Sequence, residues 1–187
     1  MKNSIYAATL LMATSFGAMA SDNGAYWGFN MGYTPATASA AASVDKTTGF
    51  GMGGHLGYNI NHNFAVESAL NGVGFLGWKS GVVNLNAFVL SGSVLGFYPV
   101  SKSAAGETID VYAKLGYANA SVGASCDVCT PTSNSKSKSA PTFGFGVELG
   151  RGQETSIRIG MDHYDLSAFA GTDMSTNDYH FTVNRAF

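Results

Sequence analysis

The chain has 187 residues, a formal net charge of −2 and a charged fraction of only 12%, which is about half the share of an average soluble domain. Its length corresponds to a single domain, and it is rich in glycine (24 residues) and in aromatic residues (12%). No stretch after residue 20 has the ~20 consecutive apolar residues of a transmembrane helix, so the chain after residue 20 is not expected to contain a membrane helix.

The first 20 residues have the pattern of a secretory signal peptide. Lys2 provides a basic start, an apolar run follows, and the small-residue triplet AMA ends at Ala20. We therefore predict cleavage between Ala20 and Ser21, with an uncleaved anchor as the alternative. The apolar run is short and interrupted by Thr and Ser, which does not suit a spanning helix. The expected organisation is a signal peptide over 1–20 and one domain over 21–187, whose net charge changes from −2 to −3 with the loss of Lys2.

Alternation of bulky apolar with small or polar side chains predicts about eight β-strands. In "AYWGFNMGYT", for example, Trp27, Phe29 and Tyr33 share one face, and the opposite face carries Gly, Asn and Thr. After this run the pattern recurs, in chain order, at 50–60, 64–70, 108–118, 143–150, 156–164 and 178–187. The stretch 82–98 also resembles a strand, but both of its faces are apolar, so its inward face is not defined.

The inner faces predicted by this alternation are too small for the interior of a soluble protein. A soluble barrel or sandwich fills its interior with the apolar face, whereas lipid would accept the bulky face and a narrow polar lumen the small one. Short connections alternate with longer polar ones, namely 61–63, 99–107 and 150–154 against 37–48, 71–81, 121–141 and 167–177. We predict an all-β, eight-stranded antiparallel up-and-down transmembrane β-barrel in the outer membrane of a Gram-negative bacterium, with short turns in the periplasm and long loops at the surface.

Distinctive segments near the C-terminus support a family resemblance. They are "VYAKLGYA", "TFGFGVELG", "SIRIGMDHYDL" and the terminal aromatic residue. With them, nearly the whole mature chain resembles the OmpA-type transmembrane domain and the small OmpX/Ail-like outer-membrane barrels. In that family the last strand ends in Phe and is recognised by the outer-membrane assembly machinery. The resemblance therefore implies an assembly signal made of Tyr179, Phe181, Val183 and Phe187, although Arg185 departs from the usual apolar choice.

Four charged residues fall on the predicted inward faces. An unpaired buried charge is very costly, so we expect Glu148 to pair with Arg158 diagonally across the hairpin at 150–154. Glu67 and Lys114 have similar predicted depth on non-adjacent strands and could meet across the barrel. Further inward groups are Asp110, Asp162, His55 and His180. The resemblance implies a lumen network that can gate a small pore, but we favour a satisfied structural core.

A C-x-x-C motif, Cys126 to Cys129, lies in the longest predicted loop. Such a pair can be a redox motif, half of a metal site or a disulfide. There is no surrounding βαβ pattern, and a zinc site would need two further ligands. In an exported chain we therefore predict a loop disulfide. Lys136 and Lys138 in the same loop are a weak signal for contact with lipopolysaccharide phosphates or another polyanion.

Asp162, His163 and Ser167 are a weak signal for a lipid A-modifying enzyme. Neighbouring side chains diverge in a strand, and the spacing from His to Ser does not match the deacylase pattern. We expect no catalytic residue, no cofactor, no metal and no nucleic-acid partner. The expected partners are outer-membrane lipid and lipopolysaccharide, the assembly machinery, and an extracellular ligand of the loops. The predicted function is structural or surface-interacting (membrane integrity, adhesion or defence), with a narrow gated pore as the alternative and lipid A modification as a distant one.

Overall fold

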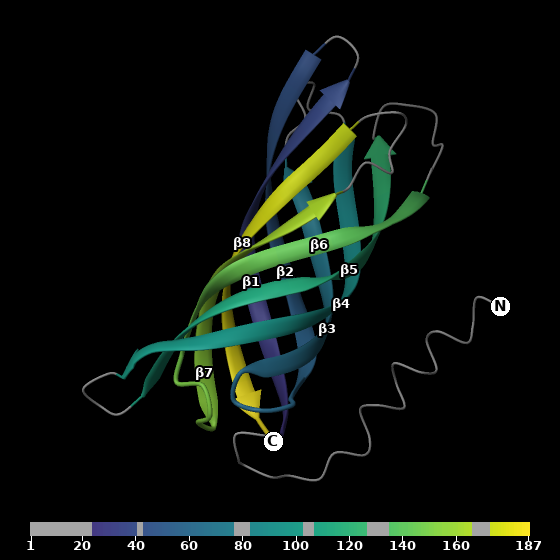
Figure 1. Cartoon of the computed structure of the whole chain (residues 1–187). Coiled ribbons are helices and arrows are strands. Elements are labelled where there is room, and N and C mark those ends of the chain that lie inside the picture. Colours follow the sequence, from purple (N-terminus) through teal and green to yellow (C-terminus); the bar gives the residue numbers. More distant parts are fainter. Residues whose placement is uncertain (1–23, 41–42, 77–82, 103–106, 127–134, 166–172) are drawn as a thin grey trace, which may run out of the picture.

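The chain forms a closed antiparallel β-barrel in the computed structural model, which describes residues 24–40, 43–76, 83–102, 107–126, 135–165 and 173–187. The strands are β1 (Gly24–Ala40), β2 (Ser43–Asn59), β3 (Phe64–Leu76), β4 (Val83–Lys102), β5 (Thr108–Cys126), β6 (Ser135–Leu149), β7 (Thr155–Asp165) and β8 (Asp173–Ala186). Each strand pairs with its neighbour in sequence, and β1 pairs with β8 to close the sheet (Figure 1). The predicted eight-stranded up-and-down barrel is confirmed. No helix in the described ranges is long and apolar enough to span a membrane.

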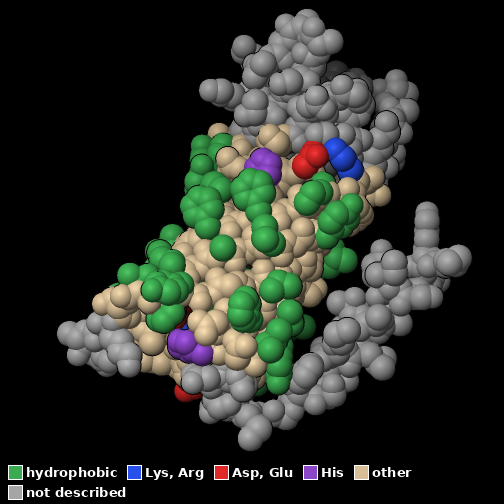
Figure 2. All heavy atoms as spheres, viewed as in Figure 1, with side chains coloured by type: hydrophobic (Ala, Val, Ile, Leu, Met, Phe, Trp, Pro, Cys, Tyr) green, Lys and Arg blue, Asp and Glu red, His purple; other side chains and the backbone are tan. Residues whose placement is uncertain are grey.

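The alternation in the sequence corresponds to the two faces of the barrel wall. On β1, Trp27 and Phe29 are each 45% exposed on the outside, whereas Tyr26 and Asn30 are at most 8% exposed on the inside. Hydrophobic side chains are spread over the outer face seen in Figure 2, and the charged ones on that face lie towards its ends. Bulky apolar groups outside and polar groups inside are the arrangement of a wall that faces lipid.

The structure shows which residues of β4 face the inside of the barrel, a question that the sequence left open. Ala87, Val89 and Leu95 point inward and are at most 1% exposed, while Phe88 and Val94 point outward. Leu95 and the inward Phe97 belong to a small buried apolar cluster that also contains Tyr26, Ala65 and Tyr112. The strand is apolar on both faces because its outer face meets lipid and part of its inner face packs in this cluster.

Two short turns and the C-terminus lie at one end of the barrel, the lower end in Figure 1, which we call the turn end. The turns predicted at 61–63 and 150–154 are confirmed, and the first one extends over 60–63. In the second turn, Gly150 (φ 76°) and Gly152 (φ 84°) adopt the left-handed conformation that side chains with a Cβ rarely accept. We call the opposite end of the barrel the extended end.

The strands continue further towards the extended end than the alternation predicted. The β1–β2 ladder runs to the pair Ala40–Ser43, which lies within the predicted link at 37–48. The other three predicted long links are also partly strand, since β3 ends at Leu76, β5 ends at Cys126, β6 begins at Ser135 and β8 begins at Asp173. At the turn end, β4 likewise continues to Lys102. These link boundaries were wrong because backbone hydrogen bonds hold a ladder together, so it can continue through polar sequence that gives no alternation.

Candidate functional site: a charged network in the lumen

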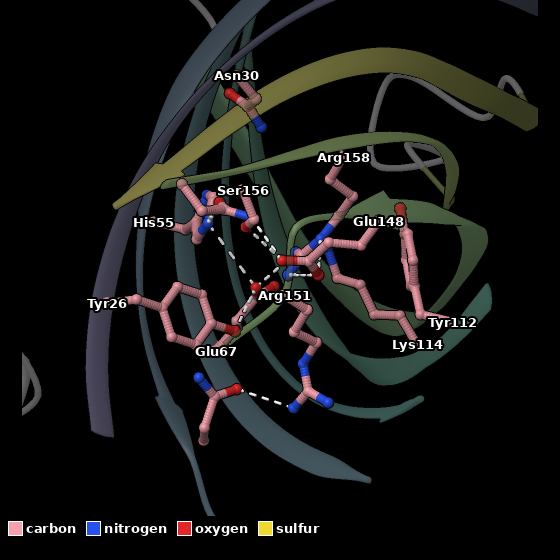
Figure 3. A network of polar contacts seen from close by, with 12 residues as sticks. Tyr26, Asn30, His55, Glu67, Tyr112, Lys114, Glu148, Arg151, Ser156 and Arg158 are labelled. Atoms are coloured by element: carbon pink, nitrogen blue, oxygen red, sulfur yellow. Dashed lines mark hydrogen bonds and ion pairs between the residues drawn. The ribbon is translucent and has the colours of Figure 1, made fainter. Parts of the chain in front are cut away.

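Arg158 on β7 lies at the centre of a buried polar network (Figure 3). Its guanidinium donates from Nε (3.1 Å) and Nη2 (3.0 Å) to Glu148 Oε2, and from Nη1 (2.6 Å) to Glu67 Oε1. The centroids of the Tyr112 and Phe97 rings lie 5.0 Å and 5.8 Å from the guanidinium carbon, within the range of cation–π attraction. One buried cation therefore neutralises two carboxylates and also contacts two aromatic rings.

Both glutamates accept further hydrogen bonds from neutral side chains. Glu148 Oε1 accepts from the Ser156 hydroxyl (2.5 Å) and from the Asn184 amide (3.2 Å). Glu67 Oε1 accepts from the Tyr26 hydroxyl (2.7 Å). Hydrogen bonds of this kind stabilise an ionised carboxylate, which makes the network a well-satisfied ionic cluster.

His55 connects β2 to the network across a glycine. Its Nε2 donates to Asn184 Oδ1 (2.8 Å) and lies 3.7 Å from Glu67 Oε1. Gly28 on β1 is the register partner of both His55 and Asn184, and a Cβ at Gly28 would overlap their side chains. The absence of a side chain at Gly28 is therefore what allows β2 and β8 to bond over β1.

A second polar cluster extends from Lys114. Its ammonium group donates to Asp162 Oδ2 (2.5 Å), which also accepts from the Tyr164 hydroxyl (3.1 Å). The Tyr164 hydroxyl accepts from Asn71 (3.3 Å), whose own Oδ1 accepts from Asn30 (3.0 Å). This chain of contacts brings together β1, β3, β5 and β7.

The structure brings Glu148 and Arg158 together, as the sequence indicated, with a difference in register. They are direct partners in the β6–β7 ladder rather than diagonal neighbours. Both side chains are 4% exposed. The five-residue turn between the two strands aligns them in this way.

The expected contact between Glu67 and Lys114 is wrong, because each residue has a different partner. Glu67 pairs with Arg158, and Lys114 pairs with Asp162. The register places Lys114, Gly144 and Asp162 in one row across β5, β6 and β7. Since Gly144 has no side chain, the ammonium group reaches Asp162 directly over it.

Arg151, in the turn at 150–154, is a buried residue that sequence reasoning missed. It is 7% exposed, and its Nη1 donates to the carbonyl oxygen of His62. Nη2 donates to Asn59 Oδ1 (2.9 Å) and to the carbonyl oxygen of Asn61 (3.3 Å), and the guanidinium lies 3.6 Å from the centroid of the Phe97 ring. An arginine in a glycine-rich turn gives no periodic signal, so nothing in the sequence indicated that it points inward.

A small pocket of about 50 Å³ lies at the turn end beside Arg151. Tyr26, Glu148, Ser156 and Asn184 contribute to its lining. The pocket therefore adjoins the Arg158 network, and Arg151 forms part of its wall.

The predicted assembly residues lie on the outer face of β8. Tyr179, Phe181, Val183 and Phe187 are 40–51% exposed. The backbone N–H of Phe187 donates to the carbonyl oxygen of Ala25 (3.1 Å), so the terminal residue continues the seam between β8 and β1.

Several predicted residues lie outside the described residues. These are Ala20 and Ser21 at the expected cleavage point, Cys129, and the side chains of Cys126 and Lys136. Lys138 is described, and its ammonium group donates to Asp165 Oδ2 (2.9 Å) in a partly exposed ion pair.

Asp162 and His163 have different surroundings. The Asp162 side chain is inside the barrel, whereas the His163 ring stacks on Phe143 (4.8 Å between centroids) and hydrogen-bonds to Asn177 (2.8 Å). Ser167 lies outside the described residues. Within the part of the chain that is described, no group of three or more His, Cys, Asp or Glu side chains is arranged to hold a metal ion.

A closed barrel with an apolar exterior and a polar, charged lumen defines the class of small outer-membrane barrels. The family model described as "Outer membrane protein beta-barrel domain" matches residues 6–187, and the chain belongs to this family. This membership confirms the predicted resemblance to outer-membrane barrels and the predicted localisation in the outer membrane of a Gram-negative bacterium.

Solved structures give the same fold at low sequence identity. The crystal structure of Neisserial surface protein A (NspA) matches with a TM-score of 0.64 and 11% identity, covering 88% of this chain and 99% of that one. Ail, the attachment invasion locus protein of Yersinia pestis, matches with a TM-score of 0.54 and 15% identity, again over 88% and 99%. Comparison with curated protein sequences gives no significant match.

Proposed function

We propose that this protein is a structural barrel of the outer membrane that presents its extended end for surface interactions. The observation that carries this proposal is the filled lumen. Side chains from all eight strands meet in it, namely Tyr26, His55, Glu67, Phe97, Tyr112, Glu148, Arg158 and Asn184. Such a network stabilises the barrel wall from the inside. Contacts with other molecules would then form on the outer surface of the barrel.

The proposed orientation places the turn end in the periplasm and the extended end at the cell surface. Short turns on the periplasmic side and longer excursions outside are typical of this class. In this proposal the chain is exported with cleavage after Ala20, Phe187 and its outward neighbours on β8 are recognised by the assembly machinery, and the outer wall contacts lipid and lipopolysaccharide.

The surface-interaction part of the proposal draws on the fold neighbours. One is described as a surface protein and another as an attachment invasion protein, and the latter was also solved with the heparin analogue sucrose octasulfate. For this chain we propose an extracellular partner of the extended end. Lys138 is already paired with Asp165, so a polyanion would have to compete with that ion pair.

A narrow gated pore is the second candidate, and one observation favours it. Some buried lumen atoms lack a hydrogen-bond partner in the described part of the chain, among them both oxygens of Asp110 and Oδ1 of Asp162. A polar lumen of this kind suits water and small ions better than a sealed core does. A lipid A-modifying activity has less support, because Asp162 and His163 point to opposite faces of the wall.

Planar-bilayer recording separates the two candidates. A structural barrel predicts no steady conductance for the wild-type protein, and opening events only after Arg158→Ala removes the central cation. The matched control is Arg185→Ala, which removes an exposed arginine that pairs with Glu154 on the outside. Steady conductance of the wild-type protein would overturn the structural proposal in favour of the pore.

The surface role is tested in cells that lack the protein. Complementation with the wild-type chain is compared with a chain in which residues 36–47 are replaced by a two-residue turn. Equal folded amounts in the outer membrane with lost surface binding would support an interaction at the extended end. Unchanged binding to every surface tested would contradict it.

A further inference from the structure

Two buried charges at the turn end have no oppositely charged partner among the described residues. Asp110 is 0% exposed, and neither of its carboxylate oxygens has a hydrogen-bond partner in the described part of the chain. Arg151 is 7% exposed, and its guanidinium bonds only to neutral acceptors, with no carboxylate at ion-pair distance among the described residues. Buried charges are normally paired because desolvation is costly, so an unmatched anion and an unmatched cation at the same end require an explanation.

The two residues are joined through the neighbouring backbone. The Thr108 hydroxyl, two residues before Asp110, donates to the carbonyl oxygen of Arg151 (3.0 Å). The Gly150 N–H donates to the carbonyl oxygen of Thr108 (2.9 Å). Asp110 is also the register partner of Glu148, three residues before Arg151. The base of the Arg151 side chain is therefore held close to β5, although its guanidinium lies on the far side of the barrel mouth.

The electrostatic surroundings of Arg151 are consistent with a nearby Asp110 carboxylate. Burial lowers the pKa of Arg151, and the carboxylates of Glu148 and Asp110 are among the groups that raise it. Glu148 is already occupied by Arg158, Ser156 and Asn184. Of these two carboxylates, Asp110 is the one without a hydrogen-bond partner among the described residues.

In its present position Arg151 bridges two turns at the turn end of the barrel. Its side chain crosses from the turn at 150–154 to the turn at 60–63 and covers the Phe97 ring. It also forms part of the wall of the pocket beside Glu148 and Ser156. Three neutral acceptors and one aromatic face hold it there, and each is individually a modest interaction.

We propose that Arg151 is a latch with two positions at the turn end of the barrel. In the closed position, seen here, it bonds to the opposite turn and narrows the pocket as part of its wall. In the open position it pairs with Asp110 on the β5 wall, which neutralises both buried charges and widens the access of small solutes to the pocket. This latch adjoins the Arg158 network but uses a different arginine and a different carboxylate, and it does not depend on whether the lumen conducts.

The test measures access to the pocket with a thiol reagent. Ser156→Cys, in a background with Cys126→Ser and Cys129→Ser, places a thiol in the pocket lining, and the folded protein in lipid vesicles is treated with a small cationic methanethiosulfonate. Ala186→Cys, also in the pocket lining, is the second reporter in case Ser156→Cys weakens the fold. Gln153→Cys, which is exposed at the same pocket, gives the reference rate.

The latch predicts opposite effects for its two members. Arg151→Ala should raise the labelling rate about tenfold or more, and Arg151→Gln should act in the same direction. Asp110→Asn keeps the shape of the side chain and removes the open-state partner, so it should lower the rate by a similar factor. Arg185→Ala, the exposed control, should leave the rate unchanged. An unchanged rate with Arg151→Ala, or a rate with Asp110→Asn that equals or exceeds the parent, would overturn the proposal.

Discussion

Glu148 and Arg158 face each other directly across the β6–β7 hairpin, joined by two hydrogen bonds of 3.0 and 3.1 Å to a single carboxylate oxygen. The same guanidinium reaches Glu67 on β3 at 2.6 Å. Arg158 is therefore the group on which two buried carboxylates depend. Its loss should be more harmful than the loss of either partner.

Replacing Arg158 with Ala is expected to destabilise the barrel by about 3–5 kcal/mol, because two buried carboxylates lose their cation. Arg158→Ala combined with Glu148→Ala should be milder than the single change, and adding Glu67→Gln should restore more of the loss. Urea-induced unfolding from lipid vesicles measures all three. Additive losses along this series would mean that the three residues are not coupled.

Gly28→Ala is expected to destabilise the barrel by about 1–3 kcal/mol, the usual cost of overpacking. The new methyl group would overlap the His55 ring and the Asn184 amide and so break the bond that links β2 to β8. The matched control is Gly92→Ala, since a Cβ there meets no atom within 4 Å. The same urea titration should separate the two variants, and equal stability would show that His55 and Asn184 can move aside freely.

The destabilisation caused by an outward arginine is expected to depend on its depth in the bilayer. Ile159 on β7 is 58% exposed and lies between Val147 and Phe181 in the ladder, so its outward neighbours on both sides are apolar. Ile159→Arg should cost about 2–4 kcal/mol in a bilayer, whereas Val100→Arg, near the turn end, should cost about 0–1 kcal/mol. Unfolding from vesicles of matched thickness measures both. Similar costs at the two positions would place the bilayer elsewhere on the barrel.

The fold was predictable because one physical signal repeats along the chain. Alternation gives the faces of a strand directly, and on β1 the outward Trp27 and the inward Asn30 lie where it placed them. Alternation did not give the inward face of β4, because both faces are apolar at Leu95 and Phe97. It also did not give the end of the β1–β2 ladder, because polar sequence continues that ladder to Ala40 and Ser43. In those places packing and backbone pairing decide the structure, and neither leaves a period in the sequence.

For the lumen site, the sequence predicted which charged residues face inward but not all of their partners. Alternation identified Glu67, Lys114 and Arg158 as inward but gave no depth within the barrel, so the partner of Lys114 was wrong. That partner depends on Gly144, which leaves the row between Lys114 and Asp162 open. Arg151 was missed because a turn residue has no strand phase.

Deleting Phe187 is expected to reduce the amount of folded protein in the outer membrane far more than it reduces the stability of the folded barrel. The residue contributes one backbone hydrogen bond to Ala25 and a half-exposed ring at the β8–β1 seam, so the purified variant should still refold into lipid vesicles with a small loss of stability. In cells, the loss of the terminal aromatic should prevent recognition by the assembly machinery. Heat-modifiable migration of outer-membrane fractions on detergent gels measures the folded amount, with Phe187→Tyr and a chain shortened within 127–134 as controls. Normal outer-membrane levels of the deletion variant would refute the assembly role, and a failure to refold in vitro would assign Phe187 to stability instead.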